Sequence, residues 1–397
     1  MRIATNTIYD QSTNAMNRQQ AALLNVGNQI SSGKKVNNPS DDPLATSKAL
    51  AISQSAAVNE QMKTARVAVR NSLGQEESVL NSVSDAIISA KTSLIKGSTG
   101  TLTDADRASI AADLQGVLDT IIGQANAADG NGSYLFGGYK TTTPPFVKDA
   151  SGNVSYVGDN GVAAQQVDSA RTMSSTDTGS KIFQSVTGTA TMVARAADSN
   201  AGTVTFSTPA IDNTSDPNYR QPFTVEFSDN AGVMQYSVNG GTPVDYVSGD
   251  KITANGVSLT LSGAPQVGDS VTVSAGGASD IFASLKSAID ALKTPTDTPE
   301  QQAALANTLN SVSNELSNNL DNVLTVRASV GSRLNELDVI DTVGENRQLN
   351  YKESISNLID LDYNDALSQY SLRQIGLTAS QKAFVDVQSM SLFNYIK

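Results

Sequence analysis

The sequence contains no cysteine, no histidine and no tryptophan among its 397 residues. Disulfides are therefore excluded, and so are zinc sites built from thiolate or imidazole and nucleophilic sites of the Ser-His-Asp or Cys-His type. The absence of cysteine leaves the compartment open, because a cytosolic protein and an exported protein without disulfides both satisfy it. We expect a protein that is not an enzyme and that binds neither a metal nor a cofactor.

Basic residues are few and scattered. The chain has 27 Lys and Arg against 39 Asp and Glu, for a net charge of −12, whereas binding to nucleic acid relies on clustered basic side chains. No run approaches the roughly 18 apolar residues of a membrane span, and Arg2 is followed by polar residues where a cleaved secretory signal has an apolar stretch. We expect a soluble protein that binds no nucleic acid, does not insert into a membrane and, if exported, leaves without a cleaved signal peptide.

Near the start of the chain, apolar residues recur at a strict seven-residue interval, at Tyr9, Met16, Leu23 and Ile30. A helix with this period presents one apolar seam along its length, and such a seam requires a partner helix. We expect this helix from about residue 8 to residue 30. Gly33 follows it and can adopt the left-handed conformation that ends helices.

Two further segments carry apolar rows of the same kind. One lies between residues 62 and 94, where Arg66 and Glu76 interrupt the apolar rows. If the helix that carries it runs continuously from residue 44 to residue 95, it is about 78 Å long. The other begins near residue 305 and continues to residue 340. Because the two seams match, we predict that they pack together as an intramolecular rod core, formed by Val69, Leu73, Leu80, Val83, Ile87, Leu94, Leu309, Leu316, Val323, Val330 and Leu337.

Capping signals indicate where helices begin. Asp42 precedes a proline suited to the first helical position, Thr103 has an aspartate three residues on, and Thr298 is followed by proline and then by a glutamine three residues on. Asp41 and Asp42 could instead form a carboxylate dyad, but a turn and a cap explain both. The glycines between residues 130 and 138 are not followed by Gly-Lys-Ser/Thr, which favours turns and bulges over phosphate binding.

Between residues 146 and 278 the apolar residues alternate with polar ones, as in the segments 223–227 and 257–261. Turn signals such as Asn255-Gly256 separate these segments, so the pattern predicts a β-domain inserted between helices. The insert contains 12 acidic and 6 basic side chains, which is typical of a solvated outer domain. A receptor-binding role is the alternative.

From residue 358 to the end, apolar residues spread around most of the helix circumference, so one partner helix cannot cover them all. Burial between several copies of the chain is the simpler explanation. The predicted assembly interface comprises Tyr9, Met16, Leu23, Ile30, Leu361, Leu367, Tyr370, Ile375, Leu377, Phe384, Leu392 and Phe393.

These patterns predict an α+β fold, in which a long antiparallel α-helical coiled-coil bundle built from both termini carries an inserted, mainly β domain. We expect a terminal helical assembly domain (residues 1–42 plus 355–397), a helical rod domain (43–145 plus 279–354) and an outer β-rich domain (146–278). Ordering about 35 residues at each terminus costs on the order of 1–2 kcal/mol per residue in backbone entropy. We therefore expect the termini to be mobile in the monomer and to become helical on assembly.

The run Ile-Ser-Ser-Gly-Lys-Lys-Val-Asn-Asn-Pro-Ser-Asp-Asp-Pro at residues 30–43 resembles the N-terminal region of the flagellin superfamily. The Met-Arg-Ile start, and Tyr-Leu-Phe-Gly-Gly-Tyr-Lys at residues 134–140 followed by Thr-Pro-Pro-Phe, are similar to the branch that joins the flagellar hook to the filament. The resemblance covers roughly residues 1–146 and, more loosely, residues 279–397, where the segment 326–334 is similar to the C-terminal helix of the superfamily. The β-insert carries no such resemblance.

The resemblance implies an extracellular structural subunit of the bacterial flagellum. Its copies would assemble into a ring between the other hook-associated protein and flagellin, after export through the flagellar type III apparatus. It also implies a cytosolic chaperone that holds the C-terminal segment. Two alternatives stay open, namely a flagellin that forms the filament itself and a secreted enzyme or translocator built on coiled coils. The absence of histidine disfavours a metalloprotease insert, and the lack of an apolar span disfavours a pore-former.

Overall fold

The computed structural model describes residues 5–99, 102–185, 191–276 and 280–389. The chain forms two compact units, which we call the terminal unit (residues 1–64 and 340–397) and the central unit (residues 65–339). The helices α2 (Pro43–Gly97) and α5 (Pro299–Ile359) each contribute to both units.

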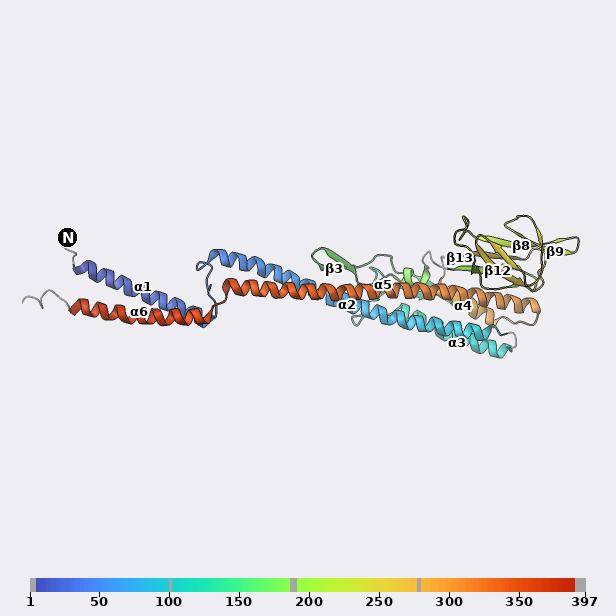
Figure 1. Cartoon of the computed structure of the whole chain (residues 1–397). Helices are drawn as coiled ribbons and strands as arrows, with labels where there is room; N and C mark the ends of the chain where they lie inside the picture. Colours follow the sequence, from blue (N-terminus) through green and yellow to red (C-terminus); the bar gives the residue numbers. More distant parts are fainter. Residues whose placement is uncertain (1–4, 100–101, 186–190, 277–279, 390–397) are drawn as a thin grey trace, which may run out of the picture. The chain divides into compact units, whose positions relative to one another are not determined.

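In the terminal unit, α1 (Thr5–Ser32) and α6 (Tyr363–Ser389) lie side by side and run antiparallel (Figure 1). The rings of Tyr9 and Phe384, near the far ends of this pair, have centroids 5.2 Å apart. At the other end the chain leaves α1 through Gly33, whose φ is +68°, and the Leu361 N–H donates to the Gly33 carbonyl oxygen at 3.0 Å. The left-handed glycine predicted to end the first helix is confirmed.

The beginning of α2 and the end of α5 also pair within the terminal unit. The side-chain amide of Asn59, which is buried, donates to the Gly344 carbonyl oxygen at 2.9 Å and to the Gln348 side-chain oxygen at 3.0 Å. Lys63 and Glu345 form an ion pair at 3.7 Å. A buried amide that donates twice across the pair fixes the register of the two helices here.

The predicted helix starts are confirmed. The Ala45 N–H donates to the Asp42 carboxylate at 2.9 Å, so Asp42 caps α2. Thr103 and the aspartate three residues on form a capping box at the start of α3 (Asp104–Ala125). Thr298 and Gln301 exchange the same pair of hydrogen bonds before α5, and Asp280 accepts from two N–H groups of α4 (Ile281–Lys293). Each cap satisfies backbone donors that the first turn leaves without partners.

In the central unit, α2 and α5 run antiparallel and side by side (Figure 1). Arg70 is bonded to Asp338 at 2.7 Å, and Lys91 further along α2 is bonded to Ser317 at 2.8 Å. The eleven apolar residues of the predicted rod core lie along the same two helices, and each is 1% exposed or less. The helices α3 and α4 pack on each other in the same unit.

The segment between α3 and α4 forms a series of strands. They are β1 (Phe146–Lys148), β2 (Val154–Tyr156), β3 (Ala164–Asp168), β4 (Arg171–Ser174), β5 (Met192–Ala196), β6 (Thr205–Phe206), β7 (Ala210–Ile211), β8 (Phe223–Asn230), β9 (Val233–Val238), β10 (Val244–Asp245), β11 (Lys251–Ala254), β12 (Val257–Ser262) and β13 (Ser270–Ala275). Strands β1 and β2 form one hairpin and β3 and β4 another. A short π-helical turn, η1 (Ser180–Gln184), follows them.

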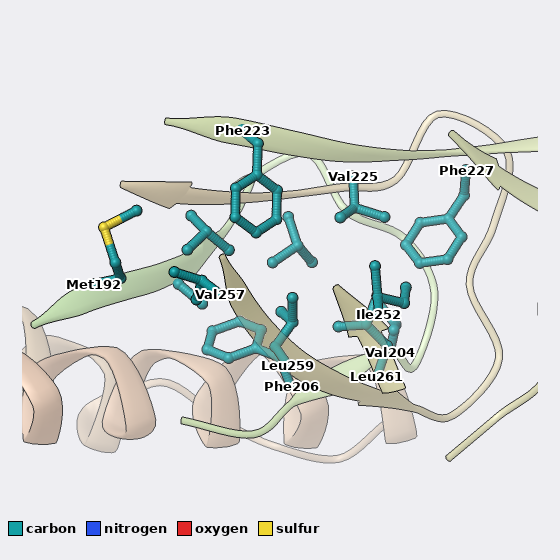
Figure 2. Packing of buried hydrophobic residues seen from close by; sticks show 13 residues of the cluster. Met192, Val204, Phe206, Phe223, Val225, Phe227, Ile252, Val257, Leu259 and Leu261 are labelled. Atoms are coloured by element: carbon teal, nitrogen blue, oxygen red, sulfur yellow. The ribbon is translucent and has the colours of Figure 1, made fainter. Parts of the chain in front are cut away.

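Strands β5 to β13 build a two-layered sandwich. One sheet has the order β10-β9-β8-β13-β5, and the other has β12 between β11 and the short strands β6 and β7. Side chains from the two layers point toward one another in Figure 2, with Phe223, Val225 and Phe227 on one side and Leu259 and Leu261 on the other. The predicted turn between β11 and β12 is confirmed, because Asn255 and Gly256 both have positive φ. We call this sandwich, residues 191–276, the β-module.

Aromatic side chains join the remaining loops to the helices. Phe146 of β1 lies with its ring centroid 5.4 Å from that of Phe183 in η1 and 5.1 Å from that of Phe282 in α4. Phe136, which is fully buried, meets Phe183 edge-on. The molecule therefore combines long antiparallel helices with an inserted β-structure, and the predicted α+β fold is confirmed.

Candidate assembly surface

The predicted seam residues lie on α1, the helix that packs against α6. Met16, Leu23 and Ile30 are half-buried, and Tyr9, although half-exposed, lies against Phe384. On the opposite helix, Tyr370, Leu377 and Phe384 are half-buried as well, as is Leu361 just before α6. Part of the predicted assembly interface therefore contacts the other terminal helix of the same chain.

Other residues of the predicted interface are uncovered. Leu367 is 52% exposed and Ile375 is 66% exposed, and their neighbour Leu372 is 68% exposed. Leu392 and Phe393 lie outside the described residues. Among the described residues of the terminal unit, twelve large apolar side chains are exposed: Tyr9, Leu24, Leu44, Leu50, Val58, Val343, Leu349, Tyr363, Leu367, Leu372, Ile375 and Val385. Exposed apolar side chains are candidates for contacts with a partner where they lie close together, as Leu372 and Ile375 do on α6.

Charge is divided unevenly between the two units. Residues 1–64 and 340–397 contain 11 basic and 11 acidic side chains, whereas residues 65–339 contain 16 basic and 28 acidic ones. The whole net charge of −12 is thus carried by the central unit. The terminal unit therefore has no net charge, and the electrostatic repulsion that comes with a net charge is confined to the central unit.

Two polar residues that interrupt the α2 seam are buried. Glu76 has 0% exposure, and its Oε1 accepts from the Asp177 N–H at 3.2 Å, while Oε2 has no hydrogen-bond partner among the described residues. Burial raises the pKa of Glu76 to about 8. The negative charge of Asp177 adds to this rise, and the positive charge of Arg333 opposes it. Arg66, 1% exposed, donates to the Val167 carbonyl oxygen at 2.9 Å.

The carboxylate of Asp177 is the charged neighbour of Glu76. Burial acts to raise the pKa of Asp177, but hydrogen bonds and charges from Lys181 and Arg333 outweigh it and lower the pKa. Lys181 donates to Asp177 at 2.7 Å, and Arg333 of α5 binds its other oxygen. Glu76 therefore lies beside an anion already held by two cations, which favours its neutral form.

Gly137 and Gly138 lie where the backbones of two loop segments approach each other too closely for a side chain. A Cβ at Gly137 would lie 2.2 Å from the Lys140 carbonyl oxygen, and one at Gly138 would lie 2.3 Å from that of Asp159. Gly138 also has a φ of +68°. The Asp159 carboxylate accepts from the Tyr139 N–H at 2.9 Å. This geometry agrees with the turn interpretation of these glycines.

One group of residues was missed by the sequence reasoning. Asparagines 307, 310, 314, 318 and 322 recur every three or four residues on one side of α5, and their side chains bond the backbone or side chains of the inserted segment. From the sequence alone, a polar stripe of this kind is interpreted as a solvent-exposed face of the helix. The sequence feature that could have indicated a contact is the repetition of asparagine at helical spacing.

Among the described residues, no group of three or more acidic side chains has the arrangement of a metal site. Asp41 accepts from the Asn37 and Asn38 N–H groups and Asp42 caps α2, so both carboxylates have structural partners. In the part of the chain that the structure describes, none of the helices has both the length and the hydropathy needed to cross a membrane.

Long antiparallel helices with matched apolar seams are typical of the class of structural coiled-coil proteins. Within that class, residues 3–141 match the family described as the bacterial flagellin N-terminal helical region. The chain is 35% identical over 398 residues to flagellar hook-associated protein 3 of Escherichia coli, covering 100% of both chains. It is also 35% identical to the protein of the same name from Salmonella typhimurium, over 99% of both chains. The chain belongs to the family of flagellar hook-associated protein 3.

Solved structures agree with this membership. The crystal structure of FlgL from Xanthomonas campestris matches with a TM-score of 0.69 and 30% identity, over 77% of this chain and 99% of that one. The flagellar hook-associated protein 3 of Legionella pneumophila matches with a TM-score of 0.71 and 25% identity, over 77% of this chain and 98% of that one. The family is a structural component of the bacterial flagellum.

Proposed function

We propose that this chain is the structural subunit that joins the flagellar hook to the filament, and that its copies assemble into a ring through the terminal unit. Family membership supports the role, and it favours this role over that of flagellin. The observation that carries the assembly mode is the set of twelve exposed apolar side chains on a unit whose net charge is zero. The proposal includes no catalytic role.

The energetics favour burial of this surface between copies. Fully burying a Leu or Ile side chain that was exposed contributes about 1.5–3 kcal/mol. Leu367, Leu372 and Ile375 are each more than half exposed, so together they can contribute several kcal/mol at each contact between subunits. The half-buried seam of α1 adds to this where neighbouring copies cover it. Assignment of these residues to the interface stays a prediction, as does the mobility of the termini in the monomer.

The proposal extends to partners and location. The ring would lie outside the cell, between the other hook-associated protein and flagellin, after the intact chain leaves through the flagellar type III apparatus. A cytosolic chaperone would hold the C-terminal segment before export, because apolar residues of α6 that await burial need cover in the cytosol. N-terminal sequencing of the protein recovered from sheared flagella tests whether a signal has been cleaved.

Deletion of the gene tests the role of the whole chain. The expected phenotype is cells that keep their hooks while flagellin is shed into the medium without polymerising, and complementation with the intact chain should restore filaments. Retention of filaments in the deletion strain would reject the junction role. Loss of all flagellin from the medium would instead point to the flagellin alternative.

A residue-level experiment tests the surface. Ile375→Asp should abolish complementation, because a carboxylate cannot be buried between copies without a large desolvation penalty. The matched control is Val267→Asp, since Val267 is equally exposed, at 65%, but lies on the β-module. Both purified variants should keep the melting temperature of the parent chain. Full motility of the Ile375→Asp strain would remove this residue from the interface.

A further inference from the structure

One face of α5 bonds to the backbone of the β-module. Asn307 accepts from the Phe206 N–H at 3.2 Å and donates to the Val204 carbonyl oxygen at 2.8 Å. Asn310 donates to the Phe206 carbonyl oxygen at 2.8 Å. The hydrogen bonds of Asn307 reach two residues that are two apart, Val204 just before β6 and Phe206 within it. A neighbouring β-strand makes the same paired donor and acceptor contacts with its partner.

A second pair of bonds, this time to a single residue, lies one layer away, immediately before β5. Asn318 accepts from the Thr191 N–H at 2.9 Å and donates to the Thr191 carbonyl oxygen at 3.1 Å. Ser311 donates to the Ala194 carbonyl oxygen at 2.7 Å. A Cβ at Gly276 would lie 2.4 Å from the Asn318 amide nitrogen, so the backbone approaches the helix as closely as a glycine permits. We call Asn307, Asn310, Ser311 and Asn318 the docking face.

The strands that receive these bonds are edge strands. Strand β5 is at one end of its sheet and β6 is at the edge of the other. An edge strand presents a row of unpaired N–H and C=O groups, which is a template for pairing with another chain. The docking face occupies backbone groups on both edges. Glu315 of α5 adds an ion pair with Arg195 of β5.

The other two edges of the sandwich are protected in other ways. Strand β10 has only two residues and follows Pro243, which cannot donate a hydrogen bond. Strand β11 carries Lys251, whose ammonium group is bonded to Asp212 at 2.8 Å. Short length, proline and lysine are common features that prevent an edge strand from pairing with another chain. Strand β5, with five residues, has none of these features, and its edge is bonded by Ser311 of α5 instead.

The contact between α5 and the β-module is narrow and polar. On one side a cleft of about 270 Å³ is lined by Arg195, Asn307 and Ser311, and on the other a cleft of about 330 Å³ is lined by Phe206, Asn307 and Asn310. The β-module has its own apolar core, in which Val225, Val271 and Val273 are fully buried. The module therefore does not need the helix for its core, and the docking face contributes hydrogen bonds and not apolar burial.

We propose that the docking face of α5 acts as a substitute strand that closes the edges of β5 and β6, and that without it these edges pair with those of a second copy of the chain. The β-module then remains folded but leaves the helix. The edge of β5 becomes an interaction surface whose partner is the same edge of another copy. This surface is separate from the assembly surface of the terminal unit.

The double variant Asn307→Ala/Asn318→Ala tests the proposal. Hydrogen exchange at the Thr191 and Phe206 amides should become faster by about tenfold or more, because their acceptors are gone. The amides of β8 and β13 should keep their protection, which shows that the module is still folded. Asn335→Ala is the matched control, since Asn335 lies on the same helix and is exposed; it should leave all of these rates unchanged.

A cysteine reports the new pairing without background, because the chain has none of its own. Ala194→Cys, at the middle of β5, lies opposite its own copy when two β5 edges pair antiparallel, so it should give a disulfide-linked dimer under mild oxidation in the double variant, and none when introduced alone. Association through the terminal unit would give oligomers without this cross-link, so the two surfaces are distinguished. The same-size pair Asn307→Asp/Asn318→Asp keeps an acceptor for each N–H but places a carboxylate against the Val204 and Thr191 carbonyl oxygens, and this repulsion should detach the edges and so also speed up exchange. Unchanged exchange in both pairs, or exposed edges that stay monomeric, would overturn the proposal.

Discussion

Replacing Glu76 with glutamine should stabilise the central unit by an amount that grows with pH. Glu76 is fully buried in the middle of the α2 seam, and its pKa of about 8 lies well above the ordinary value of 4.5. A carboxyl whose pKa is raised by folding prefers the neutral form in the folded state. Its contribution to stability is therefore present at low pH and is lost as the pH rises from about 4.5 to about 8.

The size of the effect follows from the shift. Each pKa unit corresponds to about 1.4 kcal/mol, so the wild-type carboxyl costs about 1 kcal/mol at pH 5, about 3 kcal/mol at pH 7 and about 4 kcal/mol at pH 8. Glutamine does not titrate, and its carbonyl oxygen can still accept from the Asp177 N–H. The free energy of unfolding of Glu76→Gln relative to wild type should thus rise by about 3 kcal/mol between pH 5 and pH 8.

Urea denaturation followed by far-ultraviolet circular dichroism at pH 5, 6, 7 and 8 measures this difference. The control is Glu77→Gln, one residue along α2, which removes a half-exposed carboxylate paired with Arg327. That variant should show a small loss of stability with no growth toward high pH. If the gain of Glu76→Gln were the same at pH 5 and pH 8, the buried carboxyl would not titrate as described and this reasoning would fail.

Three substitutions test other parts of the structure. Leu80→Ala in the fully buried rod core should lower the free energy of unfolding, measured in urea, by about 3–5 kcal/mol. The control Ile88→Ala, at a residue of the same helix that is 52% exposed, should change it by less than about 1 kcal/mol. Equal losses in the two variants would contradict the core assignment. Leu23→Asp should block incorporation into flagella, scored by electron microscopy, with little change in monomer melting temperature; a large drop would mean that this seam is already essential in the monomer. Gly138→Ala should lower the melting temperature, because the residue has positive φ and no room for a Cβ, while Gly74→Ala, in a helix with open space around it, should raise stability by about 0.5–1 kcal/mol.

The helices could be predicted from the sequence because their signals are local. The seven-residue recurrence of Leu73 and Leu80, and of Leu309 and Leu316, is set by the helix period itself. Capping at Thr103 depends on a residue only three positions away. These elements need no knowledge of distant contacts, and the α+β class follows from them together with the alternation in the insert.

The buried polar contacts could not be predicted in the same way. Glu76 and Arg66 read as interruptions of an apolar row, yet their partners Asp177 and Val167 lie about a hundred residues further along the chain. Asn318 likewise bonds to Thr191 across a long separation. A buried polar side chain is explained only by the group that satisfies it, and here that group comes from the insert, whose strand order depends on non-local pairing.

The pairing of α2 with α5 limits how the length of these helices can change. The interval from Arg70 to Lys91 on α2 equals the interval from Ser317 to Asp338 on α5, and each spans three heptads. A deletion in one helix alone would shift every contact on one side of it, whereas removal of one heptad from each helix at facing positions would leave the remaining pairs in place. Evolution can therefore shorten or extend this rod only by matched heptads, while the loops of the β-module tolerate single-residue insertions.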